Sequence, residues 1–355
     1  MFSFFSSKSA GVCPPFCSTI KEEKQKFSAA GGGATPPQLP VRRCRAVIIS
    51  ASRRTDIPCY YSRWFINRIK AGSVWVRNPF HPHQVSEISL SPQVVDGVVF
   101  WSKNPAPLLP LLGQVPYPFY FQFTITPYGR DLEPGLPEKR QLIDLFWQLS
   151  QATSPKQVVW RYDPILISPT YTVEYHLRSF DAMARRLAGA ADSCVISFLD
   201  SYQKTGRAGR DLGLRAPNRA EIEQLAHSFS ETAAACGFAL STCCESVDLS
   251  QWGISHGSCV DAGRLAAISG TPLRHLPDRG QRPGCGCCES VDVGVYDSCL
   301  NGCRYCYAGG GGQSALRRYE RYDEYSPLLC SSLAPGDQVA KREMASLVDD
   351  QLRFF

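Results

Sequence analysis

Short, almost continuously apolar runs recur along the chain from residue 41 onward and alternate with longer amphipathic stretches. Runs that are apolar at nearly every position are typical of parallel strands covered on both faces. The pattern predicts strands at 46–50, 97–101, 119–126, 157–161, 193–198 and 238–242. It predicts helices between them at 61–71, 139–151, 173–187 and 219–236. Repeated strand–helix alternation predicts an α/β fold that is TIM-barrel-like, as a partial or full barrel.

Two segments depart from this alternation. Residues 74–78 and 84–89 flank Pro79-Phe-His-Pro82, which predicts a hairpin. A further strand is predicted at 291–296, directly before a cysteine-rich loop near the C-terminus. We expect this strand to lie beside the strand at 46–50. The barrel would then be permuted, with the loop after its last strand at the same end as the loop after its first.

The two ends of the chain differ from its middle in composition. Residues 1–40 contain serine-rich text, mixed charge and Gly/Pro runs, so they predict a disordered N-terminal extension. This extension is either a plain one or an organelle-targeting peptide that is cleaved, and Glu22 and Glu23 favour the former. Residues 41–308 are predicted to form the α/β barrel domain, and 309–355 a Gly-rich linker with a short C-terminal tail. No apolar run approaches the ~20 residues of a membrane span, so we expect a soluble, cytoplasmic protein without a membrane partner.

Composition directs attention to the cysteines. The formal net charge of +6, from 38 basic and 32 acidic residues, is too mild to decide for or against nucleic acid. The chain has 16 cysteines, however, and six of them lie between Cys285 and Cys306. A disulfide scaffold would be shorter and would spread its cysteines among loops. The sequence therefore favours reduced thiols that bind a metal.

The sharpest motif is Cys299-Leu-Asn-Gly-Cys303-Arg-Tyr-Cys306. Structural zinc would need a second pair of ligands to close a tetrahedron. Three thiolates instead suit a 4Fe-4S cluster with one open iron, which can hold S-adenosylmethionine and pass an electron to it. Gly302 would let the loop turn tightly and bring backbone amides to the cluster sulfurs, and Tyr305 could stack on the adenine.

This spacing, with an aromatic residue before the last cysteine, resembles the signature of the radical S-adenosylmethionine enzymes. The resemblance implies a 4Fe-4S cluster, S-adenosylmethionine as a cofactor and an electron donor for the cluster. One departure is that the cysteine loop of those enzymes follows the first barrel strand, whereas here it follows the last predicted strand.

A second resemblance covers residues from about 47 to 308. Several motifs in this range are similar to those of an uncharacterised domain-of-unknown-function family, number eighteen forty-eight. They are Ile49-Ser-Ala-Ser-Arg-Arg-Thr-Asp56, Val76-Arg-Asn-Pro-Phe80, Phe100-Trp-Ser-Lys-Asn-Pro105, Trp160-Arg-Tyr-Asp-Pro-Ile165, Ile196-Ser-Phe-Leu-Asp200, His256-Gly-Ser-Cys259 and Cys285-Gly-Cys287. This resemblance implies an architecture and no particular substrate.

Polar residues follow the predicted strands at their carboxyl ends, which face one mouth in a parallel barrel. Asp56 and Asp163 could equally cap the helices that follow them. Arginines are not needed for capping, and several at one rim indicate an anionic ligand. The candidate catalytic and substrate-binding residues are Arg53, Arg54, Asp56, Lys103, Arg161, Asp163 and Glu245.

The sequence thus predicts an iron–sulfur enzyme like those that use S-adenosylmethionine, acting on a small anionic substrate or on nucleic acid. The alternative is a zinc-stabilised, non-redox module that binds phosphate or nucleic acid. Arginines interleaved with the aromatics of 60–80 suit nucleic acid, although Tyr61, Trp64 and Phe65 at helical spacing suit core packing as well. Cys285 and Cys287 could bind a second site, form a redox pair or furnish a fourth ligand.

Overall fold

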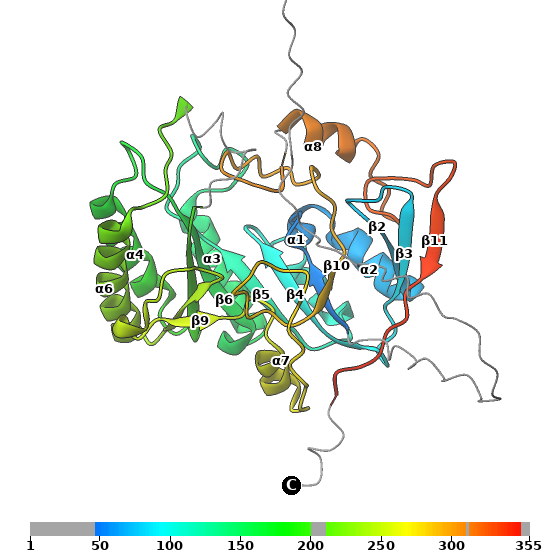
Figure 1. The fold of residues 1–355 in the computed structure, drawn as a ribbon, viewed down its shortest axis with the longest axis horizontal. Coiled ribbons are helices and arrows are strands. Elements are labelled where there is room, and N and C mark those ends of the chain that lie inside the picture. The colour runs from blue at the N-terminus through cyan, green and yellow to red at the C-terminus, as the bar shows by residue number, and fades with distance from the viewer. Residues whose placement is uncertain (1–46, 200–210, 310–311, 349–355) are drawn as a thin grey trace, which may run out of the picture.

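The computed structural model describes residues 47–199, 211–309 and 312–348. In these residues one large sheet contains eight strands, every neighbouring pair of which is parallel, in the order β10-β1-β4-β5-β6-β7-β8-β9 (Figure 1). In chain order the strands are β1 (Val47–Ala51), β4 (Val95–Ser102), β5 (Phe119–Thr124), β6 (Val158–Ile165), β7 (Ser193–Phe198), β8 (Ala239–Cys243), β9 (Ser255–Gly257) and β10 (Ser290–Asp292). The six strands predicted between 46 and 242 are confirmed, whereas only residues 291 and 292 of the strand predicted at 291–296 belong to β10. Strand β9 was not predicted because it is only three residues long.

The helices surround this sheet. They are α1 (Ile57–Tyr60), α2 (Ser62–Ala71), α3 (Lys139–Ala152), α4 (Val173–Leu187), α6 (Arg219–Ala235), α7 (Ala262–Ser269) and α8 (Gly312–Tyr319), with 3-10 turns η1 (Leu109–Gln114), η2 (Pro155–Gln157) and η4 (Ser250–Trp252). The four long helices predicted from the sequence are confirmed. Local chemistry fixes their starts: the Thr172 side chain caps α4, and Asn218 with Glu221 forms a capping box at α6.

The two faces of the sheet bury different material, because side chains alternate along each strand. Phe121 and Phe123 of β5 belong to the main core under the helices, in which α4 and α6 pack side by side (Figure 1). Tyr120 points to the other face and joins a smaller core with Val260 and Leu265. Helix α7 and the chain around it therefore cover the second face of the sheet.

The sheet is not closed by strand pairing. Its edge strands, β10 and β9, pair with only one neighbour each among the described residues. The structure thus shows a mixed α/β fold with an eight-stranded parallel sheet, and the predicted barrel closure is not established. The predicted neighbourhood of the first and last strands is confirmed, because Ile49 of β1 pairs with Val291 of β10.

A smaller sheet lies beside the large one, in the order β11-β3-β2. Strands β2 (Ser73–Arg77) and β3 (Gln84–Ser89) form the predicted antiparallel hairpin. Strand β11 (Gln338–Lys341) pairs with β3 in parallel, so the region predicted as a linker and tail adds α8 and β11 to the structure. Trp64 Nε1 donates to the carbonyl of Ser326, 2.8 Å away, which fastens this region to α2.

Some expectations cannot be compared with the structure. Residues 1–46, which include the predicted disordered extension, and residues 349–355 at the C-terminus lie outside the described residues. Within the described residues, no helix combines the length and apolar character that crossing a bilayer requires.

Candidate functional site

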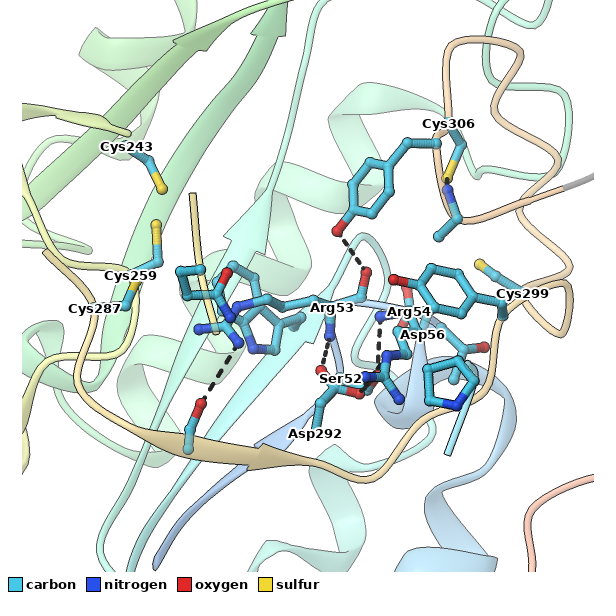
Figure 2. A pocket seen from close by; sticks show the side chains of 18 of the residues that line it. Ser52, Arg53, Arg54, Asp56, Cys243, Cys259, Cys287, Asp292, Cys299 and Cys306 are labelled. Carbon is cyan, nitrogen blue, oxygen red and sulfur yellow. Dashed lines mark hydrogen bonds and ion pairs between the residues drawn. The ribbon is translucent and has the colours of Figure 1, made fainter. Parts of the chain in front are cut away.

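A pocket of about 780 Å³ opens at the carboxyl ends of the large sheet. Its lining includes residues that end or follow β1, β4, β6, β7 and β8, as the parallel arrangement predicts. Of the residues that the structure describes, eight cysteines line it, together with seven basic and four acidic side chains. Figure 2 shows Cys299 and Cys306 toward one end of this pocket and Cys243, Cys259 and Cys287 toward the other. The volume is in the range of ligand pockets.

The loop that carries Cys299, Cys303 and Cys306 follows β10 and forms part of the pocket wall. Several hydrogen bonds fix its backbone. The Tyr61 hydroxyl donates to the carbonyl of Ser298 at 2.6 Å. The Gly135 amide donates to the carbonyl of Asn301 at 3.1 Å. The loop is therefore held from α1–α2 on one side and from the chain after β5 on the other.

Within the loop, the backbone turns as the sequence predicts. Gly302 has a φ of 67°, a conformation that favours glycine. The Cys306 amide donates to the carbonyl of Cys303 at 3.1 Å, and the Ala308 amide donates to the Cys306 sulfur at 3.4 Å. The last contact is an N–H···S bond of the kind that tunes iron–sulfur clusters.

Burial raises the pKa of all three thiols, that of Cys299 to about 12. Lys103 acts in the opposite direction on Cys303. As the side chains of the described residues stand, no group of three or more His, Cys, Asp or Glu forms a ready set of metal ligands. Any metal bound here would have to displace the thiol protons and draw the side chains around it.

Asp56 connects the cysteine loop to the sheet. Its carboxylate accepts from Ser102 Oγ at 2.7 Å, from the Lys103 amide at 2.8 Å and from Asn301 Nδ2 at 3.1 Å. It also accepts from the Cys59 amide at 3.0 Å and so caps α1, the role weighed against catalysis from the sequence. Burial raises the pKa of Asp56, and these donors oppose that effect.

Lys103 lies in a buried network that the sequence did not reveal. Glu133, which is 2% exposed, accepts from Lys103 Nζ at 2.8 Å and also from Lys139. The Tyr305 hydroxyl donates to the same carboxylate. Although burial alone would raise it, the two lysines lower the pKa of Glu133 to about 2. The hydroxyl of Tyr305 is therefore fixed by Glu133, and its ring contacts the ring of Tyr128 edge-on with centroids 5.6 Å apart.

Arg53 and Arg54 are organised by Asp292, the last residue of β10. Asp292 accepts from Ser52 Oγ at 2.6 Å and from the Arg53 amide at 2.8 Å, and its carboxylate lies 3.9 Å from Arg54 Nε (Figure 2). The Arg53 guanidinium lies over Trp101, 5.2 Å from the ring centroid. Its Nη2 is buried without a hydrogen-bond partner among the described residues.

Arg161 and Asp163 form an ion pair, the structural role weighed against ligand binding from the sequence. The Arg161 Nη1 also donates to Gln122 Oε1 at 3.3 Å and to the Cys259 sulfur at 2.8 Å. Both paired residues line the pocket, and Arg161 lies over the face of Trp101 at 5.1 Å. Two arginines thus lie against one indole.

The structure brings six of the seven rim candidates to the wall of one pocket. Glu245 is not among the lining residues and accepts from the Phe198 amide at 2.9 Å. Gly302 is likewise absent from the lining, whereas Tyr305 belongs to it. Tyr61, Trp64 and Phe65 are fully buried, so they pack the core and do not offer rings for base stacking.

Sequence reasoning missed Asp292 and Glu133. Asp292 ends a three-residue strand, and its position before a glycine-containing turn is the only signal that could have drawn attention to it. Glu133 lies in a Pro/Gly-rich connection where a carboxylate is ordinarily solvated. Only the fold shows that two lysines converge on it.

Comparison with known proteins gives a family. The family model described as Domain of unknown function (DUF1848) matches residues 48–308. The chain belongs to this family. Searches of curated proteins and of solved structures found no match. The DUF1848 region contains the whole large sheet from Ile48 of β1 onward and the cysteines that line the pocket, while α8 and β11 lie beyond it.

Proposed function

We propose that this DUF1848 protein is an iron–sulfur enzyme of the radical S-adenosylmethionine type that acts on an anionic substrate. The observation that carries the proposal is the shared pocket. Cys299, Cys303 and Cys306 line the same space as Arg53 and Arg54, although the two groups are separated by more than half the chain. The pairing of β10 with β1 is what brings the two loops together.

The cysteine loop suits a cluster with three protein ligands. Its three sulfurs border a space large enough for a further ligand, and its backbone already donates one N–H to a cluster-ligand sulfur. A 4Fe-4S cluster with an open iron, when bound there, would supply the electron for reductive cleavage of S-adenosylmethionine. An external electron donor must reduce it.

Two tyrosines are candidates for the adenine. Lys103 Nζ lies 5.6 Å from the centroid of the Tyr305 ring, so stacking on that face requires the lysine to move. Tyr307 also lines the pocket and is 41% exposed, with its hydroxyl donating to the Arg53 carbonyl at 3.0 Å. The ring of Tyr307 is the more accessible of the two, and the sequence reasoning did not single it out.

The charge of the lining supports an anionic substrate. Among the described residues of the lining, basic side chains outnumber acidic ones by seven to four. Arg161 is largely committed to Asp163 and would act by positioning. The side chain of Arg54 lines the pocket and is 22% exposed, and its guanidinium lies 5.2 Å from the centroid of the Tyr296 ring. Arg54 is therefore the strongest candidate for direct contact with a carboxylate or phosphate.

Metal content tests the cluster. The full chain is purified and reconstituted without oxygen, and iron and acid-labile sulfide are measured per chain beside the visible spectrum. We expect about four irons and four sulfides, and loss of both when Cys299, Cys303 and Cys306 are all replaced by Ala. Cys236→Ala, at the end of α6, is the matched control and should retain them. Iron retained in the triple variant would refute the assignment, and zinc in its place would favour the non-redox alternative.

Turnover tests the chemistry. Reduced, reconstituted protein is incubated with S-adenosylmethionine, and 5′-deoxyadenosine is measured by chromatography. We expect formation that depends on the reductant and disappears in the triple variant, but not in Cys236→Ala. A loaded cluster that yields no 5′-deoxyadenosine under any reductant would contradict the proposed activity while leaving the cluster in place.

A further inference from the structure

Four other cysteines gather at the opposite end of the pocket, and the proposed function does not use them. Cys243 ends β8, Cys259 follows β9, and Cys285 and Cys287 precede β10. Their side chains form one hydrogen-bonded group, in which Cys287 contacts each of the other three. Figure 2 shows Cys243 and Cys259 pointing toward each other beside Cys287. Three segments thus bring four cysteines to one end of the pocket.

The backbone around these cysteines is tied together independently of the sulfurs. Ser258 Oγ donates to the Gly286 carbonyl at 2.6 Å, and the Cys288 amide donates to the Val260 carbonyl at 2.8 Å. A Cβ on Gly286 would lie 2.9 Å from Ser258 Oγ, so glycine permits this close approach. The Val260 amide also lies 3.5 Å from the Cys287 sulfur and points to it. The sulfurs are therefore held in place by their surroundings.

Positive charge adjoins this group of thiols. Arg161 Nη1 donates to the Cys259 sulfur at 2.8 Å. Arg53 interacts electrostatically with both Cys287 and Cys259, and its Nη2 is buried without a hydrogen-bond partner among the described residues. An unsatisfied buried guanidinium nitrogen is costly beside neutral thiols. Thiolates with a net negative charge would offset the cost of burying this guanidinium nitrogen.

We infer that Cys243, Cys259, Cys285 and Cys287 form a second metal centre, which holds one zinc ion in four thiolates. Four thiolates outweigh the charge of a divalent ion by two, and Arg53 and Arg161 place positive charge beside that excess. The inference does not rest on the proposed enzyme activity. The Cys-Gly-Cys pair, left open by the sequence between a second site and other roles, would supply two of the ligands.

A single ion suits this group of cysteines better than a cluster does, because it lets its four ligands lie closer together. Zinc–sulfur bonds of about 2.3 Å in a tetrahedron place the sulfurs about 3.8 Å apart. Cys287 already lies within hydrogen-bonding range of Cys243, Cys259 and Cys285, although the four sulfurs do not form a ready set of ligands as the side chains of the described residues stand. A 4Fe-4S cube would push its ligands farther apart, because cluster atoms lie between them. Small side-chain rotations and loss of the thiol protons would complete the zinc shell.

The site would also have a structural effect. Cys259 follows one edge strand of the open sheet, and Cys285 and Cys287 precede the other. A zinc ion there would join the two edges that strand pairing leaves apart. Binding should therefore stabilise the whole sheet and not only a local loop.

Zinc content is measured in the Cys299/Cys303/Cys306→Ala background, in which the proposed iron cluster has been removed. We expect about one zinc ion per chain, and a loss of about tenfold or more when Cys259→Ser or Cys287→Ser is added. Cys244→Ser is the matched control, because Cys244 adjoins Cys243 but its sulfur lies toward the Pro283 carbonyl. Its zinc content should not change. Cobalt substitution should give the visible bands of tetrahedral thiolate coordination.

A labelling experiment covers the case in which the serine variants do not fold. The Cys299/Cys303/Cys306→Ala protein, with its other cysteines intact, is treated with an alkylating reagent before and after a chelator removes zinc. Mass spectrometry then identifies which cysteines have been alkylated. We expect the four thiols to be protected together, to become reactive on chelation and to be protected again by added zinc. Four thiols that react independently of zinc, a disulfide between any two of them in the native protein, or iron with sulfide at this site would each overturn the inference.

Discussion

The structure allows an estimate of how much the buried carboxylate of Glu133 contributes to the free energy of unfolding. Its folded pKa of about 2 lies below the ordinary value of 4.5 for a glutamate, so the native state binds fewer protons than the unfolded state. Its contribution to stability is therefore complete above the unfolded pKa and is lost as pH falls through the folded pKa. A shift of this size corresponds to about 3 kcal/mol at pH 7, and to roughly half of that at pH 3. Glu133→Gln should remove it, leaving Lys103 and Lys139 facing each other.

The assay is the free energy of unfolding against pH, from denaturant titrations of both proteins. We expect a difference of about 3 kcal/mol at pH 7, which for a chain of this size lowers the melting temperature by about 5 °C. The difference should shrink steadily below pH 4.5. Glu223→Gln is the control, because Glu223 pairs with Arg219 on the surface and should cost less than about 1 kcal/mol. A Glu133→Gln difference that stayed constant between pH 7 and pH 3 would refute the linkage.

Three further predictions concern other parts of the fold. Burial lowers the pKa of His176 to about 4, so His176→Gln should abolish the part of the stability loss that occurs as pH falls from 6.5 to 4, measured by the same titrations. Gly135→Ala would place a Cβ 2.7 Å from the Asn301 carbonyl, so it should displace the cysteine loop and reduce reconstituted iron several-fold with little change in helix content by circular dichroism. Arg161→Lys keeps the charge but loses the planar fork, so zinc content should fall while the melting temperature of the zinc-free protein stays close to that of the parent; a lower melting temperature of the zinc-free variant would indicate a purely structural role.

The large sheet could be predicted because its strands carry the signal at every position. Runs such as 193–198 are buried on both faces, and their apolar character follows directly from that environment. The three-residue strand β9 is too short to carry a periodic pattern, and the apolar run at 291–296 predicted β10 but not its short extent. Closure into a barrel was expected from the strand–helix alternation, but alternation also fits an open sheet. The register and the curvature of the strands decide between a closed barrel and an open sheet, and local sequence predicts neither.

The candidate site was predictable where one segment carries its own pattern. The three cysteines of 299–306 are close in sequence, and so are the arginines after β1. The four cysteines at the other end of the pocket are spread over 45 positions and three segments, so local spacing indicates only Cys285 and Cys287 and not their two partners. The same is true of Asp56, whose four donors come from α1, the end of β4 and the cysteine loop. Contacts between distant segments become visible only in the fold.

The strand order explains why so much chemistry meets at one mouth. From β1 to β9 each successive strand of the large sheet is added on the same side of β1, whereas the last strand, β10, pairs with β1 on its other side. The chain must therefore cross the gap between the sheet edges after β9. That crossing segment buries Val260 and Leu265 against the second face of the sheet and carries Cys259, Cys285 and Cys287. Its arrival at β10 places the loop of Cys299–Cys306 directly beside the arginines after β1. One topological feature thus accounts both for the shared pocket of the proposed enzyme and for the edge-to-edge position of the inferred zinc site.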